Sequence, residues 1–162
     1  MAVVGFDFGT TNSLISVIVG DRAIDIVDAE TALPFPSVVR YEGERTIVGH
    51  EAKQSLDTAG EGIHGDTVLS PKFQLGKESV HVGGVERSPV DIVYDVVNHV
   101  KSEALKDPRA EVLEGVTSAV VTIPLIMNGR QRAALDQRRR TARRLAPLNS
   151  FPGTDRPARA FI

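Results

Sequence analysis

The chain has 162 residues, a formal net charge of −2 and no cysteine. This length allows one core of ordinary size, the small net charge gives no general attraction to nucleic acid or anionic membranes, and the lack of cysteine excludes disulfides and thiolate catalysis. The longest apolar runs fall well short of the ~20 residues of a membrane helix, and from the first residues we expect no signal peptide. We therefore expect a cytoplasmic protein without membrane or nucleic-acid partners.

The N-terminal segment predicts a phosphate-binding turn. An apolar strand over residues 3–8 breaks at Gly9 into a run of small hydroxyl and amide residues, and a second strand follows at 14–19. Glycine lets successive backbone N–H groups converge on an anion. Hydroxyl groups add donors, and we expect them to come from Thr10, Thr11 and Ser13.

Asp7 is the second part of this signal. A carboxylate beside bound phosphates would be repelled unless a divalent cation lay between them. A magnesium nucleotide explains the combination, although Gly, Thr, Asn and Ser also form ordinary hairpin turns that need no ligand. The chain contains no P-loop motif.

The middle of the chain alternates short strands with turns. A third strand over residues 23–27 should complete an antiparallel meander with the first two. The sequence further predicts strands at 36–41 and 46–48, a short helix at 51–56, a polar loop at 57–67 and a hairpin over 80–86 that turns at Gly83 and Gly84.

Four histidines, His50, His64, His81 and His99, lack the paired spacing of a metal site, so we expect structural or solvated side chains. Lys72 follows Ser-Pro in a loop-like context. A single lysine in such a place is usually a solvated surface charge.

The strongest helix signal begins at Ser88. This serine should be the N-cap, with Pro89 at the first helical position and Asp91 in the first turn. Apolar residues recur at helical spacing up to Leu105 and predict a core-facing helix. A buried strand over residues 119–123 should follow, ended by Pro124.

Four segments together resemble the seventy-kilodalton heat-shock chaperones of the actin and sugar-kinase ATPase superfamily. Residues 5–13 (GFDFGTTNS) are similar to the first phosphate motif of that family, and 36–41 (PSVVRY) with 48–53 (VGHEAK) to its next segment. Residues 70–76 (SPKFQLG) resemble the lysine-bearing segment, and 121–132 (VTIPLIMNGRQR) a later one. The resemblance spans roughly residues 3–135.

The resemblance implies roles for individual residues. Lys72 would reach the γ-phosphate and help to position the attacking water, and Asp7 would bind Mg²⁺ through water. Pro124 and Arg132 would relay nucleotide state to a substrate domain, although a strand terminator and a helix-surface charge explain them equally well. The sequence departs from the family at Ile126, where the family has a tyrosine, so this chain lacks a hydroxyl at that position. The nucleotide-side residues are Asp7, Gly9, Thr10, Thr11, Asn12 and Lys72.

The implied fold is α/β: an incomplete, ribonuclease-H-like (actin-type ATPase) first lobe with a mixed sheet and flanking helices. For a complete protein, the resemblance implies binding and release of unfolded polypeptides driven by ATP hydrolysis to ADP. Mg²⁺, J-domain co-chaperones and nucleotide exchange factors would take part. A metabolite kinase or an actin-like filament protein of the same superfamily remains an alternative.

The resemblance ends where the composition changes. Residues 136–162 hold seven of the fourteen arginines and are rich in proline. We expect a lobe over residues 1–135 and a divergent tail over 136–162, from truncation or a frameshift; a basic interaction tail is the alternative. A single lobe provides donors on only one side of a nucleotide. We therefore expect little ATPase activity from this chain alone.

Overall fold

A computed structural model describes residues 2–19, 21–54, 56, 61–107, 116–121 and 129. Several predicted features lie outside these ranges: the relay residues Pro124 and Arg132, the departure from the family at Ile126 and the domain boundary at residue 135. So does the Arg-rich segment 136–162.

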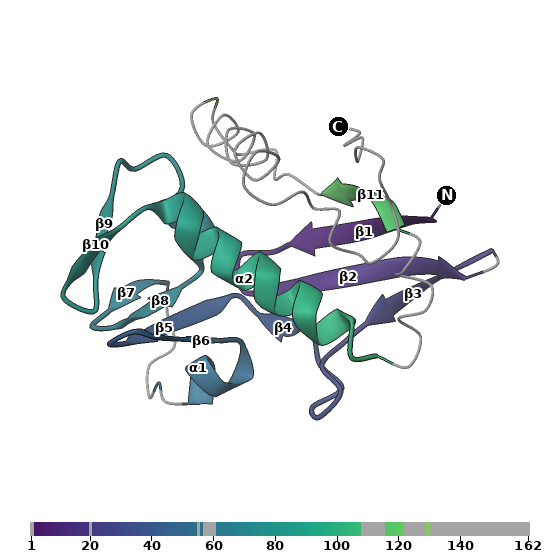
Figure 1. Cartoon of the computed structure of the whole chain (residues 1–162), viewed down its shortest axis with the longest axis horizontal. Coiled ribbons are helices and arrows are strands. Elements are labelled where there is room, and N and C mark those ends of the chain that lie inside the picture. The colour runs from purple at the N-terminus through teal and green to yellow at the C-terminus, as the bar shows by residue number, and fades with distance from the viewer. Residues whose placement is uncertain are drawn as a thin grey trace.

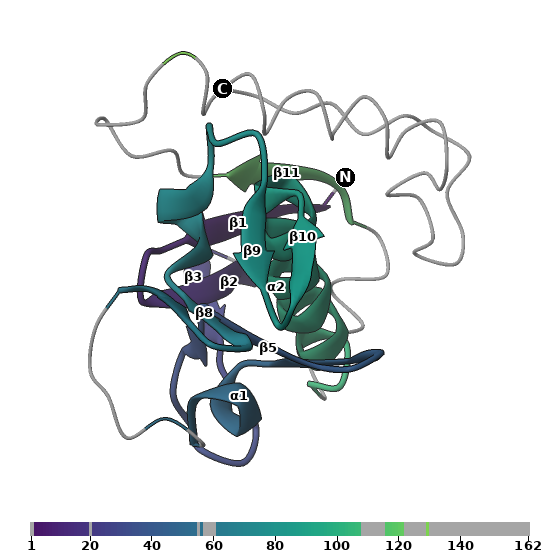
Figure 2. The ribbon, with the colours of Figure 1, turned by 90° about the vertical axis from the view of Figure 1, so that its left-hand side faces the viewer.

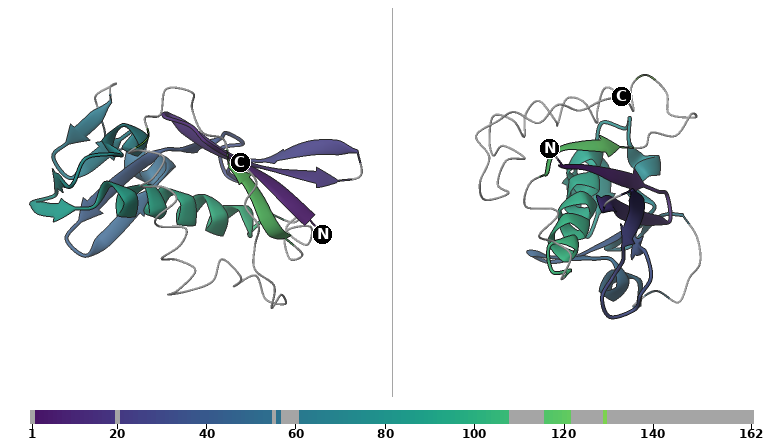
Figure 3. Two further views of the ribbon diagram at one scale, coloured as in Figure 1. Left: turned by 90° about the horizontal axis from the view of Figure 1, so that it is seen from above. Right: turned by 90° about the vertical axis from the view of Figure 1, so that its right-hand side faces the viewer.

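The N-terminal strands form the predicted antiparallel meander. Strand β1 (Ala2–Phe8) pairs with β2 (Asn12–Val19), and β2 pairs with β3 (Arg22–Ile26). Strand β11 (Val116–Val121) joins the other side of β1 in parallel, as Figure 3 shows, and the short β4 (Phe35–Pro36) pairs with the start of β2. The sheet is therefore mixed, and its order is β11-β1-β2-β3.

A second sheet has the order β6-β5-β8-β7. It is built from β5 (Val38–Glu42), β6 (Arg45–Val48), β7 (Gly62–His64) and β8 (Thr67–Leu69), and the short helix α1 (His50–Gln54) follows β6. The prediction of a polar loop over 57–67 is wrong for residues 62–64 and 67. Three-residue strands give almost no periodic signal, and pairing of β8 with β5 decides their conformation.

The predicted hairpin after this sheet is confirmed. Strands β9 (Val80–Val82) and β10 (Val85–Arg87) pair across Gly83 and Gly84, which have φ angles of 58° and 76°. Two consecutive positive φ values are what a tight hairpin turn needs, and glycine adopts them without steric cost. Figure 2 shows this hairpin leading into the long helix.

Helix α2 (Pro89–Ala104) begins after Ser88, as predicted. It packs against β2 of the first sheet and against β5 and β6 of the second, so it crosses both (Figure 1). Its apolar stripe is buried as expected, except that Val97 is only partly buried and Leu105, just after the helix, is 41% exposed. The side chain of Ser88 makes no capping hydrogen bond; its carbonyl accepts from the N–H groups of Asp91 and Ile92.

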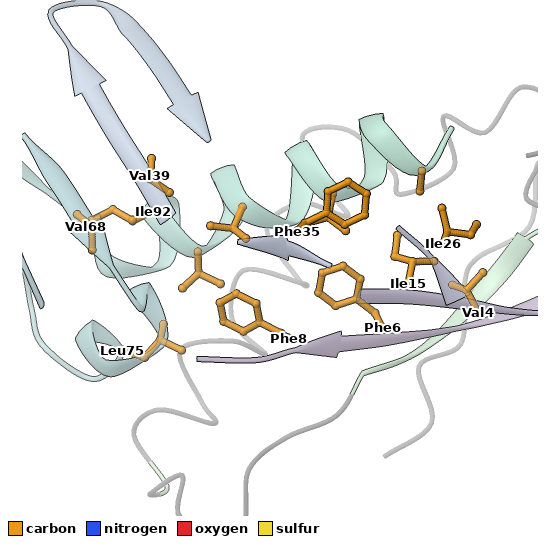
Figure 4. Packing of buried hydrophobic residues seen from close by; sticks show 14 of the residues in the cluster. Val4, Phe6, Phe8, Ile15, Ile26, Phe35, Val39, Val68, Leu75 and Ile92 are labelled. Carbon is orange, nitrogen blue, oxygen red and sulfur yellow. The ribbon is translucent and has the colours of Figure 1, made fainter. Parts of the chain in front are cut away.

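One apolar core joins the two sheets to α2 (Figure 4). Aromatic side chains from β1 and β4 lie beside branched aliphatic side chains from β2 and α2. The cluster includes Phe6, Phe8, Ile15, Val17, Phe35, Val39, Val68, Ile92, Val96 and Val100. This arrangement confirms the expected α/β class and fixes the ends of β1 and β2, where the predicted phosphate turn lies.

Candidate nucleotide-phosphate site

The turn between β1 and β2 consists of Gly9, Thr10 and Thr11. A Cβ added to Gly9 would lie under 3.0 Å from the backbone carbonyl oxygen of Asn12, closer than real Cβ atoms come to another atom. The φ of Gly9 is not in the left-handed region. Glycine is therefore needed here because it has no side chain, and not because of its wider range of backbone dihedral angles. Only glycine therefore allows the turn to close this tightly.

The turn presents polar groups outward. Thr11 and Asn12 are exposed and Thr10 is half-buried. Asp7 is exposed near the end of β1, opposite Leu14 of β2. Its carboxylate lies close enough to the Lys72 ammonium to act on its charge.

The expectation that Ser13 offers its hydroxyl to an anion is wrong. Ser13 is fully buried, and its Oγ lies 2.9 Å from the Oγ of Ser37. Ser37 in turn donates to the carbonyl oxygen of Gly9 at 3.1 Å. A serine hydroxyl has one proton; Ser37 uses it on Gly9, so Ser13 is the donor to Ser37.

Lys72 is not the solvated surface charge that its sequence context suggested. It lies in a 3₁₀ helix, η1 (Pro71–Gln74), and is only 7% exposed. Its ammonium donates to the carbonyl oxygen of Phe8 and lies 5.2 Å from the centre of the Phe8 ring. Figure 4 places Phe8 and Leu75, the residue after η1, at the same end of the core.

The electrostatics of Lys72 follow from this position. Burial lowers the pKa of its ammonium from the ordinary value of 10.5, and the nearby Asp7 carboxylate opposes that shift. A buried cation that keeps a neutral carbonyl partner and a neighbouring carboxylate would gain from a further anionic ligand.

The structure thus brings together six predicted residues at one end of β1 and β2: Asp7, Gly9, Thr10, Thr11, Asn12 and Lys72. Sequence reasoning missed Ser37 and Ser70. Ser37 was noted only as part of a family segment, although a polar residue inside the apolar run 35–39 is itself a signal. Ser70 gives no such signal, because its left-handed backbone (φ 53°, ψ 60°) is visible only in the structure.

In the part of the chain that the structure describes, the other polar side chains form no comparable centre. Within the described ranges no group of three or more His, Asp or Glu side chains is placed to hold a metal ion. His50 lies 3.1 Å from the hydroxyl of Thr31, and the ring of His99 packs edge-on against Phe35. Among these same residues, no helix is long and apolar enough to cross a membrane.

Comparison with known proteins decides the family. The family model described as "Hsp70 protein" matches residues 3–107 of this chain. The chain belongs to the Hsp70 family. It is also 35% identical over 133 residues to the chaperone protein DnaK of Mycoplasma mycoides subsp. mycoides SC, an alignment that covers 82% of this chain.

Membership of the Hsp70 family confirms the resemblance and the actin-like ATPase fold that it implied, and it sets aside a metabolite kinase or a filament protein. The chain spans about a fifth of the curated relative, since the alignment covers 21% of that DnaK. What a whole Hsp70 protein does is therefore a separate question from what this chain contains.

Proposed function

We propose that this Hsp70 chain provides one side of a Mg²⁺–ATP site, in which the β1–β2 turn and Lys72 bind the nucleotide phosphates. The observation that carries the proposal is the buried Lys72 ammonium, bonded to the carbonyl of Phe8 directly beside the Gly9 turn. A desolvated cation next to a glycine turn with exposed hydroxyl donors suits a polyanion.

Each group has a distinct role in this proposal. An ammonium has three protons, so the bond to Phe8 leaves Lys72 able to donate to the γ-phosphate and stabilise charge that develops there during phosphoryl transfer. The backbone of Gly9 and the hydroxyls of Thr10 and Thr11 bind phosphate oxygens, with Asn12 beside them. Asp7 holds Mg²⁺ through water.

The residues fit a magnesium nucleotide by their chemistry. Asp7 is exposed, as a carboxylate that acts on a hydrated cation has to be. A Mg²⁺ ion supplies the positive charge that neutralises adjacent phosphates. Glycine at position 9 lets the turn close, because a Cβ there would meet the carbonyl oxygen of Asn12.

For a complete protein we infer the function that Hsp70 membership favours: an ATP-driven cytoplasmic chaperone that binds and releases unfolded polypeptides. J-domain co-chaperones and nucleotide exchange factors would act on its ATP and ADP states, and Pro124 and Arg132 would relay those states. We further propose residues 1–135 as the Hsp70 lobe and 136–162 as a divergent tail.

A calorimetric titration with Mg²⁺–ATP tests the site. Lys72→Met should weaken binding about 10- to 100-fold, the range expected when a charge-assisted hydrogen bond is lost. Lys77→Met is the matched control, because Lys77 is an exposed lysine close by, bonded to Gln74 at 2.8 Å. Lys72→Met leaves the carbonyl of Phe8 without its donor, so the melting temperature of the variant is measured first to establish that it is folded. Equal affinities in the two variants would refute the role of Lys72.

A further inference from the structure

Ser37 is a junction between the β1–β2 turn and the segment that carries Lys72. Its side chain is fully buried, and its hydroxyl accepts from Ser13 and donates to the carbonyl oxygen of Gly9. Its backbone is bonded in both directions as well. The N–H donates to the carbonyl oxygen of Thr11 at 2.8 Å, and the carbonyl accepts from the N–H of Ser70 at 3.2 Å.

Together with short stretches of backbone, these hydrogen bonds form a closed loop that contains the turn and Lys72. Ser70 precedes η1, and its carbonyl accepts from the N–H of Phe73 at 3.0 Å. Lys72, inside that helix, bonds back to Phe8, the residue before Gly9. The turn and the lysine are therefore held by one continuous set of hydrogen bonds that passes through Ser37.

This closed loop of hydrogen bonds fixes which polar groups of the turn face outward. In a trans peptide the C=O and the following N–H point in opposite directions, and the described residues include no cis peptide bond. Ser37 holds the carbonyls of both Gly9 and Thr11 toward itself. The N–H groups of Thr10 and Asn12 are consequently directed away from the buried serine, as an anion site requires.

Ser70 supports the same arrangement. It adopts the left-handed conformation although it is not a glycine. Such a conformation persists when its surroundings over-determine it, and the bond from its N–H to Ser37 is one of those surroundings. The direction in which Pro71 and Lys72 leave the second sheet thus depends on the carbonyl of Ser37.

We propose that Ser37 is a positioning residue of the phosphate site: it turns carbonyl oxygens of the β1–β2 turn away from the ligand and sets the turn against Lys72. This proposal rests on the proposed function, because it assigns a role within the same site. Ser37 itself touches no ligand and acts through Gly9, Thr11 and Ser70.

Two neighbouring serines provide a matched test. Ser37→Ala removes the donor to Gly9, whereas Ser13→Ala leaves that bond in place and removes only the Ser13–Ser37 contact. Both variants delete one fully buried hydroxyl, but Ser37→Ala loses two hydrogen bonds and Ser13→Ala only one, so the melting temperature should fall further in Ser37→Ala. Thr67→Val is a control away from the turn, since its buried hydroxyl bonds to Asp66.

Mg²⁺–ATP affinity should separate the variants. Ser37→Ala should bind about tenfold more weakly, the size expected for one lost hydrogen bond that fixes a turn, while Ser13→Ala and Thr67→Val stay within about threefold of wild type. Ser37→Cys keeps the volume and a weak donor, so it should be intermediate, and it replaces the alanine variant if that variant does not fold. Equal losses in all variants would show a purely structural role and overturn the proposal.

A measurement without nucleotide distinguishes this proposal from the proposed function. The Thr10 amide resonance and the pH titration of the Lys72 side chain, followed by NMR, should move in Ser37→Ala and not in Ser13→Ala. If wild type fails to bind Mg²⁺–ATP but these signals move, the proposed function fails and the coupling through Ser37 stands. If wild type binds and the signals stay, the role of Ser37 is refuted.

Discussion

At the residue scale, two glycines of β1 and its turn have opposite requirements. A Cβ at Gly9 would meet the Asn12 carbonyl oxygen, but a Cβ at Gly5 would lie at an ordinary 3.7 Å from the Cβ of Ser16. Gly9→Ala should therefore lower the free energy of unfolding by about 1–3 kcal/mol, as overpacked sites do, and weaken Mg²⁺–ATP binding. Gly5→Ala should be neutral or slightly stabilising, because glycine weakens a strand.

Urea denaturation of the two glycine variants measures this difference. An equal loss of stability in both would show that glycine at the turn has no special steric role. A Gly9→Ala protein that is less stable but binds Mg²⁺–ATP with wild-type affinity would contradict the proposed backbone contact with phosphate.

His99 should give the fold a pH dependence below neutrality. Burial lowers its pKa from the ordinary 6.5, with Glu103 opposing that shift, and its ring packs against Phe35 and the backbone of Gly49. The unfolded chain then takes up a proton before the folded one does. Stability from this group is complete above about pH 6.5 and is lost as the pH falls through that value toward the folded pKa.

The melting temperature between pH 7.5 and pH 5 tests this prediction. His99→Gln should have a smaller fall on acidification than wild type, because glutamine does not titrate. His64→Gln, at an exposed position, controls for the loss of a histidine. An unchanged pH profile in His99→Gln would contradict the prediction.

Gly9, Lys72 and Ser13 show how much of the candidate site could be predicted from the sequence. The tight turn at Gly9 follows from local chemistry and is confirmed, while the binding of an anion there stays a prediction. The burial of Lys72 and the inward position of Ser13 depend on contacts with Phe8 and Ser37, which are far away in sequence. No local pattern of hydroxyl and charged residues contains that information.

At the element scale, the start of α2 was predicted correctly, but the side-chain cap expected from Ser88 does not form. Ser88 occupies the N-cap, yet its hydroxyl makes no capping bond and Pro89 occupies the first turn. A side-chain cap typically contributes about 1 kcal/mol. Ser88→Ala should therefore lower the free energy of unfolding by less than about 0.5 kcal/mol, measured by urea denaturation; a loss near 1 kcal/mol or more would show a cap that forms in solution.

The elements recovered from sequence and those missed differ in the origin of their stability. The long helix and the β1–β3 meander have local periodicity, and the Gly83–Gly84 turn has its own signature. Strands β7 and β8 are three residues each and are fixed by pairing with each other and with β5. The residues of a short strand that is stabilised by a distant partner show no recognisable strand pattern.

At the scale of the whole molecule, α2 should unite the two sheets into one cooperative unit. Val96 is fully buried in the apolar core cluster. Figure 4 shows residues of both sheets, such as Ile15 and Val39, in that cluster. Val96→Ala should cost about 2–3 kcal/mol, from lost burial plus a cavity. Hydrogen exchange should then accelerate in β2 and β5 alike. Faster exchange in one sheet alone would show that the sheets unfold independently.

The central claim is that the β1–β2 turn and Lys72 bind nucleotide phosphates, and NMR mapping tests it most directly. Isotope-labelled wild-type chain is titrated with Mg²⁺–ATP, with Mg²⁺ plus adenosine as the control lacking phosphates. We predict saturable shifts that are largest at Gly9, Thr10, Thr11 and Lys72, and absent with adenosine. Shifts that centre on the β9–β10 hairpin or on the arginines of residues 136–162, or that adenosine reproduces, would contradict the claim.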